Sequence, residues 1–398
     1  MEARRKIYSA LAAAGVALTS FATPCVAQEG STTEASPPWV LTLSTNYGDW
    51  KADKLGNAGS QGVGFAQLGY TGREYGGAVT TRYVRTDYLT AQSPDRFSIS
   101  TTADVELSDY YTCESGSMAL RGGVDLTIPT GKGAYSTDEL TRILSDPLGS
   151  DLMSVNLYNQ GLNVSPHFLV ANTFSKSMSM GIGAKYTFTG EYTPTTDVEG
   201  DRYKPGSRLM VIGNGAYGFT EADFLAVNLI YYTVGRDTRN GEDVYRTGDL
   251  FSADIKYLKS WNENLMSMFA LIVMTQRSNE YMNAELALEA ESRNSNNNSV
   301  EVVAYGGYKL TGEITLSGVA GYKNVAANAY EPGDAFYDAG RWKAYLEPGV
   351  IWNAAHGMQL AGKIRYTRIM DKKDAFEAED NTYSLLNADI SLVYNFGL

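Results

Sequence analysis

Histidine-dependent catalysis has only two candidate residues in this chain, His167 and His356. His167 stands in the middle of an alternating stretch, on its polar side, and His356 stands in a short turn between two such stretches. Lipid hydrolysis needs a His and a Ser together on an apolar face, where the His activates the hydroxyl group, and His167 has the opposite parity. We therefore interpret His167 as a hydrogen-bonding side chain of a polar surface and expect no enzymatic activity.

Three other segments carry reactive residue types. PTGKGAYST (129–137) is similar to a phosphate-binding loop, but Leu126 occupies the position of its first glycine, five residues before Gly131. DKKDAFEAED (371–380) is rich in carboxylates but has no fixed spacing of cation ligands, so we interpret it as a solvated loop. Cys113 is interpreted as a small residue in a turn rather than a reactive thiol. We expect neither a metal site nor a cofactor.

Many charged residues fall on the polar side of alternating stretches, with acids and bases interspersed. They are Asp104, Glu106, Arg121, Asp125, Lys185, Asp254, Lys256, Glu301, Lys309, Lys343, Glu347, Lys363, Arg365 and Asp389. Two interpretations remain open: the charges pair across strands and fill an interior, or they line a path for a solute. Arg121 paired with Asp104 or Glu106 on the preceding strand is an example of the first. Neither sign is in enough excess to indicate ion selectivity.

The stretches that position these charges alternate with a period of two, which is typical of β-strands with one apolar and one polar face. In LLNADISLVYNFGL at the end of the chain, one parity is almost wholly apolar and the other almost wholly polar. In RWKAYLEPGVIWN (341–353), Trp342, Leu346, Val350 and Trp352 share one face. Ten residues of strand tilted by ~45° place the two Trp roughly 23 Å apart along the membrane normal, close to the ~25 Å apolar band of a membrane barrel.

Sixteen such segments follow one another, and their connections alternate between short turns and long polar loops. They begin near Trp39, Gly62, Ala78, Phe97, Ser117, Gly161, Met178, Ser207, Ala222, Gly248, Leu265, Val300, Glu313, Trp342, Met358 and Asn381. This predicts an all-β fold, a transmembrane antiparallel up-and-down β-barrel of about 16 strands (14 to 18), with short periplasmic turns and long extracellular loops. A soluble sandwich also alternates, but the aromatic strand ends and the alternating loop lengths favour contact with lipid.

The first 27 residues have the charged start, apolar centre and small-residue end of a secretory signal peptide. We expect a short periplasmic segment at 28–38 and the barrel at 39–398. Without the signal peptide the formal charge changes from −12 to −14 (30 basic against 44 acidic residues), which argues against nucleic acid as a partner. The expected location is the outer membrane of a Gram-negative-type bacterium.

One long loop, residues 132–160, has features of its own. Ser136 and Glu139 have capping-box spacing and are followed by apolar residues at helical spacing. The candidate gate residues are Leu140, Ile143, Leu144, Leu148 and Leu152. The short helix packs either on the barrel rim or inside the lumen as a constriction or gate. In the lumen, we expect its apolar residues to meet the stretch LMSMFALIVM (265–274), whose lumen side carries several Met residues.

Two motifs carry a family resemblance. YNFGL resembles the C-terminal strand that outer-membrane proteins present to the barrel assembly machinery, with the terminal aromatic displaced to Phe396. GGVDLTIPTGKG (122–133) followed by GLNVSPHF (161–168) resembles the outer-membrane proteins of the phenol meta-cleavage pathway type, a group compared with channels for hydrophobic compounds. The resemblance implies a porin-like channel, with membrane lipid, the assembly machinery and a small-molecule solute as partners.

Three functions follow from this sequence. The first is an outer-membrane channel or transporter for small solutes, hydrophobic ones included, with loop 132–160 as its constriction or gate. The alternative is a structural or surface-adhesion barrel with a blocked lumen. An outer-membrane barrel enzyme is third, because the histidine supply is small.

Overall fold

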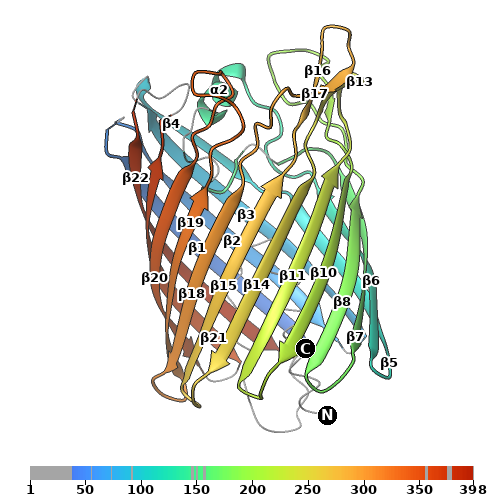
Figure 1. Cartoon of the computed structure of the whole chain (residues 1–398), viewed down its shortest axis with the longest axis vertical. Coiled ribbons are helices and arrows are strands. Elements are labelled where there is room, and N and C mark those ends of the chain that lie inside the picture. The colour runs from blue at the N-terminus through green and yellow to red at the C-terminus, as the bar shows by residue number, and fades with distance from the viewer. Residues whose placement is uncertain are drawn as a thin grey trace.

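The structure is a computed structural model (Figure 1). It describes residues 38–397 except 55, 73, 91–92, 145–147, 149–150, 156–157, 355–356 and 374–378. The expected signal peptide, the segment 28–37 and His356 therefore lie outside the described residues, and the division of the chain at its N-terminus stays a prediction.

Sixteen antiparallel strands form a closed barrel, because the first strand pairs with the last along its whole length. The strands are β1 (Trp39–Ala52), β2 (Ala58–Thr71), β3 (Tyr75–Thr90), β4 (Ser93–Thr102) continued by β5 (Val105–Ser115), β6 (Met118–Ile128), β7 (Asn163–Thr173), β8 (Met178–Thr187), β10 (Arg208–Gly218), β11 (Asp223–Val234), β14 (Leu250–Ser260), β15 (Leu265–Gln276), β18 (Ser299–Lys309), β19 (Ile314–Val325), β20 (Arg341–Asn353), β21 (Met358–Asp371) and β22 (Asn381–Phe396). The predicted fold class and strand number are confirmed.

The fourth strand differs from the prediction, because it is interrupted at Ala103 and Asp104. β4 pairs with the C-terminal part of β3, and β5 pairs with its N-terminal part and with β6. Both residues at the interruption are buried. Loop 132–160 follows β6, and both of its ends contact the wall at this interruption.

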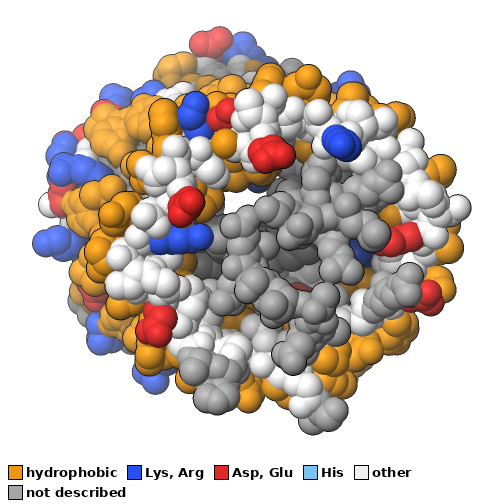
Figure 2. Space-filling model, turned by 90° about the horizontal axis from the view of Figure 1, so that it is seen from below, with side chains coloured by type: hydrophobic (Ala, Val, Ile, Leu, Met, Phe, Trp, Pro, Cys, Tyr) orange, Lys and Arg blue, Asp and Glu red, His pale blue; other side chains and the backbone are white. Residues whose placement is uncertain are grey.

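Apolar side chains cover the outside of the barrel. Leu346, Val350 and Trp352 of β20 are 59%, 43% and 44% exposed, which confirms the outward parity expected from the sequence. Leu386, Ile390 and Tyr394 of β22 show the same pattern. Figure 2 shows hydrophobic side chains around the circumference when the barrel is viewed along its axis. With no water in a bilayer core, such a closed barrel satisfies every strand edge while presenting hydrocarbon to lipid.

The two ends of the barrel differ in their connections. Short turns gather at one end and long connections at the other (Figure 1), as expected for periplasmic and extracellular ends. The long connections hold a second sheet of five short strands, β9 (Tyr203–Lys204), β12 (Asp237–Arg239), β13 (Glu242–Arg246), β16 (Glu280–Met282) and β17 (Leu288–Ala290), which the sequence analysis did not predict. They also hold the helix α2 (Thr137–Leu144). None of the helices among the described residues has the length and apolar character to cross a bilayer.

Candidate functional site: the lumen and its inserted loop

The helix α2 begins with the capping box that the sequence predicts. The Glu139 amide donates to Ser136 Oγ over 3.2 Å, and the Ser136 amide donates to a Glu139 carboxylate oxygen over 3.0 Å. Lys132 Nζ contacts the other carboxylate oxygen at 2.5 Å. Burial raises the pKa of Glu139, but the hydrogen bonds from Lys132 and Ser136 outweigh this and hold the pKa below its ordinary value. Glu139 therefore stays ionised at the start of the helix, where a negative charge is favoured.

A second carboxylate, from a neighbouring extracellular loop, also binds the N-terminal end of α2. Asp197, in the connection between β8 and β9, accepts a hydrogen bond from the Thr137 amide at 2.6 Å. This bond lowers the pKa of Asp197 below its ordinary value of 3.8. The backbone of Tyr135 also pairs with Pro194 and Thr196. The inserted loop, as we call residues 132–160, is therefore joined to the neighbouring extracellular loop.

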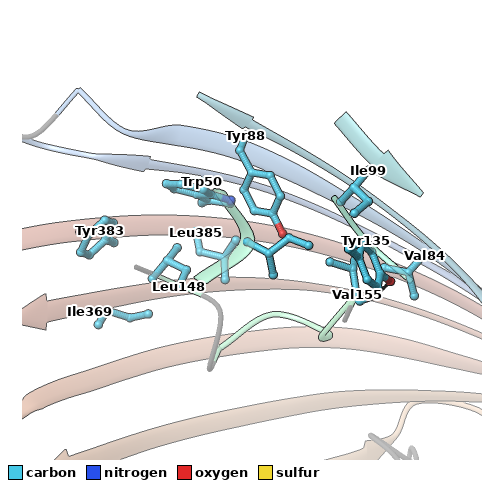
Figure 3. Close-up of a cluster of buried hydrophobic side chains, with 11 residues drawn as sticks. Trp50, Val84, Tyr88, Ile99, Tyr135, Leu148, Val155, Ile369, Tyr383 and Leu385 are labelled. Carbon is cyan, nitrogen blue, oxygen red and sulfur yellow. Dashed lines mark hydrogen bonds between the residues drawn. The ribbon is translucent and has the colours of Figure 1, made fainter. Parts of the chain in front are cut away.

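The described part of the inserted loop lies inside the barrel rather than on its rim. Ile143, Leu148 and Val155 belong to a buried cluster with side chains of the lumen wall, which come from β1, β3, β4, β21 and β22. The wall members are Trp50, Val84, Tyr88, Ile99, Ile369, Tyr383 and Leu385. Figure 3 shows the loop passing between these strands, with Leu148 beside Leu385 and Ile369. Burying one such aliphatic side chain contributes about 1.5–3 kcal/mol relative to leaving it in water.

The five candidate gate residues take part in this cluster unequally. Leu148 is completely buried, and Ile143 is 8% exposed. Leu140 and Leu152 are partly buried against the cluster. The side chain of Leu144 lies outside the described residues.

The prediction that the inserted loop packs against the stretch 265–274 was wrong. None of the described cluster members comes from β15, whose lumen side carries Met266, Met268 and Met274. The cluster lies on the wall formed by the strands at the two ends of the chain instead. The apolar side chains on the lumen side of β15 therefore face the lumen but are not the surface against which the loop packs.

Polar contacts fix the loop at its middle. The Gln61 side chain on β2 bonds twice to the backbone of Met153: its amide nitrogen donates to the carbonyl oxygen, and its oxygen accepts from the amide, each over 2.9 Å. Gln61 is 6% exposed and also donates to Thr86 Oγ1 over 2.8 Å. A paired clasp of this kind holds one backbone residue in a defined position, because a buried amide is costly to leave unbonded.

Ionic contacts attach the loop to the next part of the wall. Asp151 lies 2.7 Å from Lys343 Nζ and 3.3 Å from an Arg341 nitrogen, both on β20. The Asp151 side chain is 11% exposed and those of its partners 24% and 23%. Lys343, a predicted lumen residue, thus binds the loop.

Asp104 closes the base of the loop. Its carboxylate accepts hydrogen bonds from the amides of Thr130 (3.1 Å), Gly131 (3.0 Å) and Asn159 (2.8 Å), so it holds both ends of the inserted loop at the interruption in the wall. A Cβ atom on Gly131 would lie 2.5 Å from the Thr102 carbonyl oxygen, which explains glycine at this close approach. Asp104 is therefore an anchor for the loop, and the predicted pair with Arg121 was wrong.

The remaining predicted charges are mostly paired across the wall. Glu106 pairs with Arg82 and Asp125 with Lys185 at 2.7 Å between strands, whereas Asp254 pairs with Lys256 at 2.6 Å along the same strand, β14. Glu347 contacts Arg365 at 2.7 Å and Lys363 at 3.6 Å, and Glu301 accepts from the Tyr345 hydroxyl at 3.0 Å. Asp389 faces the lumen opposite Lys363. Lys309 is exposed at the end of β18.

Arg121 and His167 have partners other than those first considered. Arg121 donates to Thr112 Oγ1 at 3.0 Å and lies 4.2 Å from the centre of the Tyr110 ring. His167 Nδ1 lies 3.6 Å from Asp125. Both side chains face the lumen, which confirms that they belong to the polar face of their strands. The expected Arg121–Glu106 pair was wrong, because Glu106 contacts Arg82 instead.

A cavity of about 500 Å³ remains at the extracellular end, beside β10 and β11. Tyr135 and Leu140 of the inserted loop line one side, and Arg208, Tyr232 and Val234 of the wall line the other. Sequence reasoning missed Gln61, Asp151 and, except for the predicted gate residue Leu140, the side chains that line this cavity. Those on strands alternate in the same way as the other wall residues, and the rest lie in loops. Only the three-dimensional approach of the loop to the wall distinguishes them from other polar residues.

Neither a protein-family model nor any curated protein matches the chain. Among solved structures, the deltaS2 mutant of the TodX monoaromatic hydrocarbon channel is similar, with 12% identity, a TM-score of 0.47, and 92% of this chain and 91% of that chain covered. For the COG4313 outer membrane channel from Pseudomonas putida F1 the identity is 10%, the TM-score 0.40, and the coverage 63% and 92%. For a bacterial polysaccharide outer membrane secretin the values are 8%, 0.47, 91% and 100%. At these identities and TM-scores, the function of this chain is inferred from its own residues.

Proposed function

We propose that the protein is an outer-membrane channel for small solutes, hydrophobic ones included, and that the inserted loop forms its constriction. One observation carries this proposal: the loop is fixed to one side of the lumen, against β1–β4 and β20–β22, while a cavity of about 500 Å³ remains on the other side, beside β10 and β11. A barrel of sixteen strands leaves an aqueous channel unless something fills it. Here the inserted loop fills only part of the lumen.

The wall opposite the loop suits a solute of mixed character. Its lumen side carries Ile212, Ile230, Met268 and Val303, close in register to the paired charges of β14. Because acids and bases are matched there, the wall presents polarity without a strong net charge. Apolar patches beside neutral ion pairs favour small, weakly polar molecules over a selected ion.

The proposed location in the outer membrane follows from the outer surface of the barrel. A belt of aliphatic and aromatic side chains around a closed barrel fits a bilayer, and barrels of this type belong to Gram-negative outer membranes. Lipid is then the partner of the outer face, and β22 is the segment presented to the barrel assembly machinery. Export by a signal peptide at 1–27 is part of the same proposal.

No catalytic role is proposed for the lumen. His167 is the histidine among the described residues, and its neighbouring Asp125 is engaged by Lys185. The Ser165 hydroxyl bonds to Thr187 Oγ1 over 2.9 Å, not to His167. The arrangement therefore lacks the nucleophile–base contact that hydrolysis uses.

An adhesion role is the alternative, and the small extracellular sheet is the observation in its favour. Tyr281 and Leu286 of this sheet and its turn are 41% and 67% exposed, and Phe336, from the connection between β19 and β20, lies with its ring centre 6.4 Å from that of Tyr281 and is 59% exposed. Such a role needs no open lumen, so permeability separates the two functions.

Swelling of proteoliposomes tests the channel proposal. Purified protein, verified by a heat-dependent gel shift, should let small solutes such as glycerol and benzyl alcohol enter faster than they enter empty liposomes. Larger oligosaccharides should be excluded by the constriction. Swelling no faster than in liposomes with heat-denatured protein would favour the blocked barrel.

A further inference from the structure

Four tyrosines line the extracellular cavity. Tyr135, Tyr192, Tyr203 and Tyr232 line it, together with two prolines and Leu140. The rings of Tyr192 and Tyr203 meet edge to face, with centroids 5.8 Å apart and an angle of 73°. Its volume lies in the range of small-molecule pockets, and such a wall offers ring faces and ring edges to a planar apolar ligand.

The acids near this cavity already have partners. Asp237 accepts from the Tyr203 hydroxyl and, at 2.7 Å, from the Gly206 amide. Asp201 is held by the guanidinium of Arg239 through two bonds of 2.7 and 2.9 Å. Asp237 lines the cavity itself, but both of its carboxylate oxygens accept from these donors, and the charge of Asp201 is paired with Arg239.

Arg208 is the basic residue that lines the cavity. It is the first residue of β10 and is half-buried on the lumen side. Within the part of the chain that the structure describes, no carboxylate lies at ion-pair distance from it. A half-buried guanidinium without an acidic partner attracts an anion, and its planar fork matches a carboxylate.

We propose that this cavity binds a small aromatic carboxylate, with the carboxylate on Arg208 and the ring among the tyrosines. Tyr192 and Tyr232 line the same space, and a tyrosine hydroxyl is a further hydrogen-bond donor for a carboxylate. An uncharged aromatic molecule would bury Arg208 without compensation, and an aliphatic anion would leave the ring faces unused. The proposal deepens the proposed function, since the cavity lies on the extracellular approach to the constriction.

Calorimetric titration of the detergent-solubilised protein tests this directly. The probes are sodium benzoate, benzyl alcohol, which lacks the charge, and cyclohexanecarboxylate, which lacks the aromatic ring. Benzoate should bind about tenfold or more tightly than either, the ratio expected when a charge-assisted hydrogen bond or the aromatic contacts are lost. This comparison needs no variant. Equal binding of benzoate and benzyl alcohol, or no binding of benzoate, would overturn the assignment.

Two variants locate the site. Arg208→Gln should weaken benzoate binding about tenfold or more and leave benzyl alcohol unchanged. The control is Arg293→Gln, because Arg293 is a surface arginine paired with Glu331 at 2.9 Å, away from the cavity. An equal loss in both variants, or none in Arg208→Gln, would contradict the site. Binding in detergent is independent of conduction: benzoate binding without permeability would refute the channel alone, and permeability without benzoate binding would refute this inference alone.

Discussion

Among the described residues of the inserted loop, Leu148 has the most completely buried side chain, so Leu148→Ala measures how firmly the loop is held. Its side chain has no exposed surface and packs in the cluster with Leu385 and Ile369. Removing the buried groups from such a leucine costs about 2–5 kcal/mol, the transfer term plus the cavity left behind. The cost falls on the docked loop alone, because an undocked Leu148 is in water.

At the lower bound, a loss of about 2 kcal/mol raises the ratio of undocked to docked loop roughly 30-fold. Arg142 in α2 reports this change, because in the docked loop it lies 5.3 Å from the Phe97 ring centre on the barrel wall. When opening is fast relative to cleavage, the rate of tryptic cleavage follows the population of the open form. We therefore expect cleavage after Arg142, identified by mass spectrometry, to accelerate at least about tenfold.

The matched control is Leu346→Ala, which removes the same groups from a lipid-facing position that is 59% exposed and does not contact the loop. Both variants should retain the heat-dependent gel shift of the closed barrel. Equal cleavage rates in the two variants would refute the claim that burial of Leu148 holds the loop.

Three further predictions concern charge and facing. Asp151→Asn removes the anion that two basic wall residues hold in the lumen, so channels should open more often and become more anion-selective, read from the reversal potential in a KCl gradient; an unchanged potential would contradict the pairing. The pKa of Asp197 is lowered, so its bond to α2 is fully present above the ordinary pKa of 3.8 and is lost as the pH falls below it through the lowered pKa. Opening frequency should accordingly rise on acidification to pH 3, and Asp197→Asn should reduce this rise. Leu43→Arg, on the lipid side of β1, should cost ~2–4 kcal/mol of stability near the midplane, whereas Ser44→Arg, on the lumen side, should cost much less; equal losses in urea titration would reverse the assigned facing.

The barrel itself was predictable because successive side chains of a strand point to opposite faces. This alternation is visible in the sequence wherever one face meets lipid. Leu346 and Trp352 take their outward positions from parity alone. The interruption between β4 and β5 was not predictable, since Ala103 and Asp104 break no pattern. It depends on a carboxylate that binds amides from both ends of the inserted loop.

The docked position of the inserted loop was predictable only in part. Its apolar residues indicate that it needs an apolar surface, and its helix cap follows from Ser136 and Glu139. The surface it meets was not predictable, because parity says that a wall residue faces inward but not what lies opposite. The methionines of β15 suggested a contact surface for the loop, but the structure places that surface on β1, β3, β4, β21 and β22. Gln61 and Asp151, which fix the loop, are each a single polar residue without a motif.

The conductance of single channels in planar bilayers tests the central claim most directly. Residues 136–152 are replaced by a short Gly-Ser linker, and the control replaces 283–287, an exposed turn of the extracellular sheet. Because the loop occupies the lumen beside β1–β4 and β20–β22, the first replacement should raise the conductance several-fold, and the control should leave it unchanged. An unchanged conductance in the loop replacement, in protein that still shows the heat-dependent gel shift, would contradict the assignment of the inserted loop as the constriction.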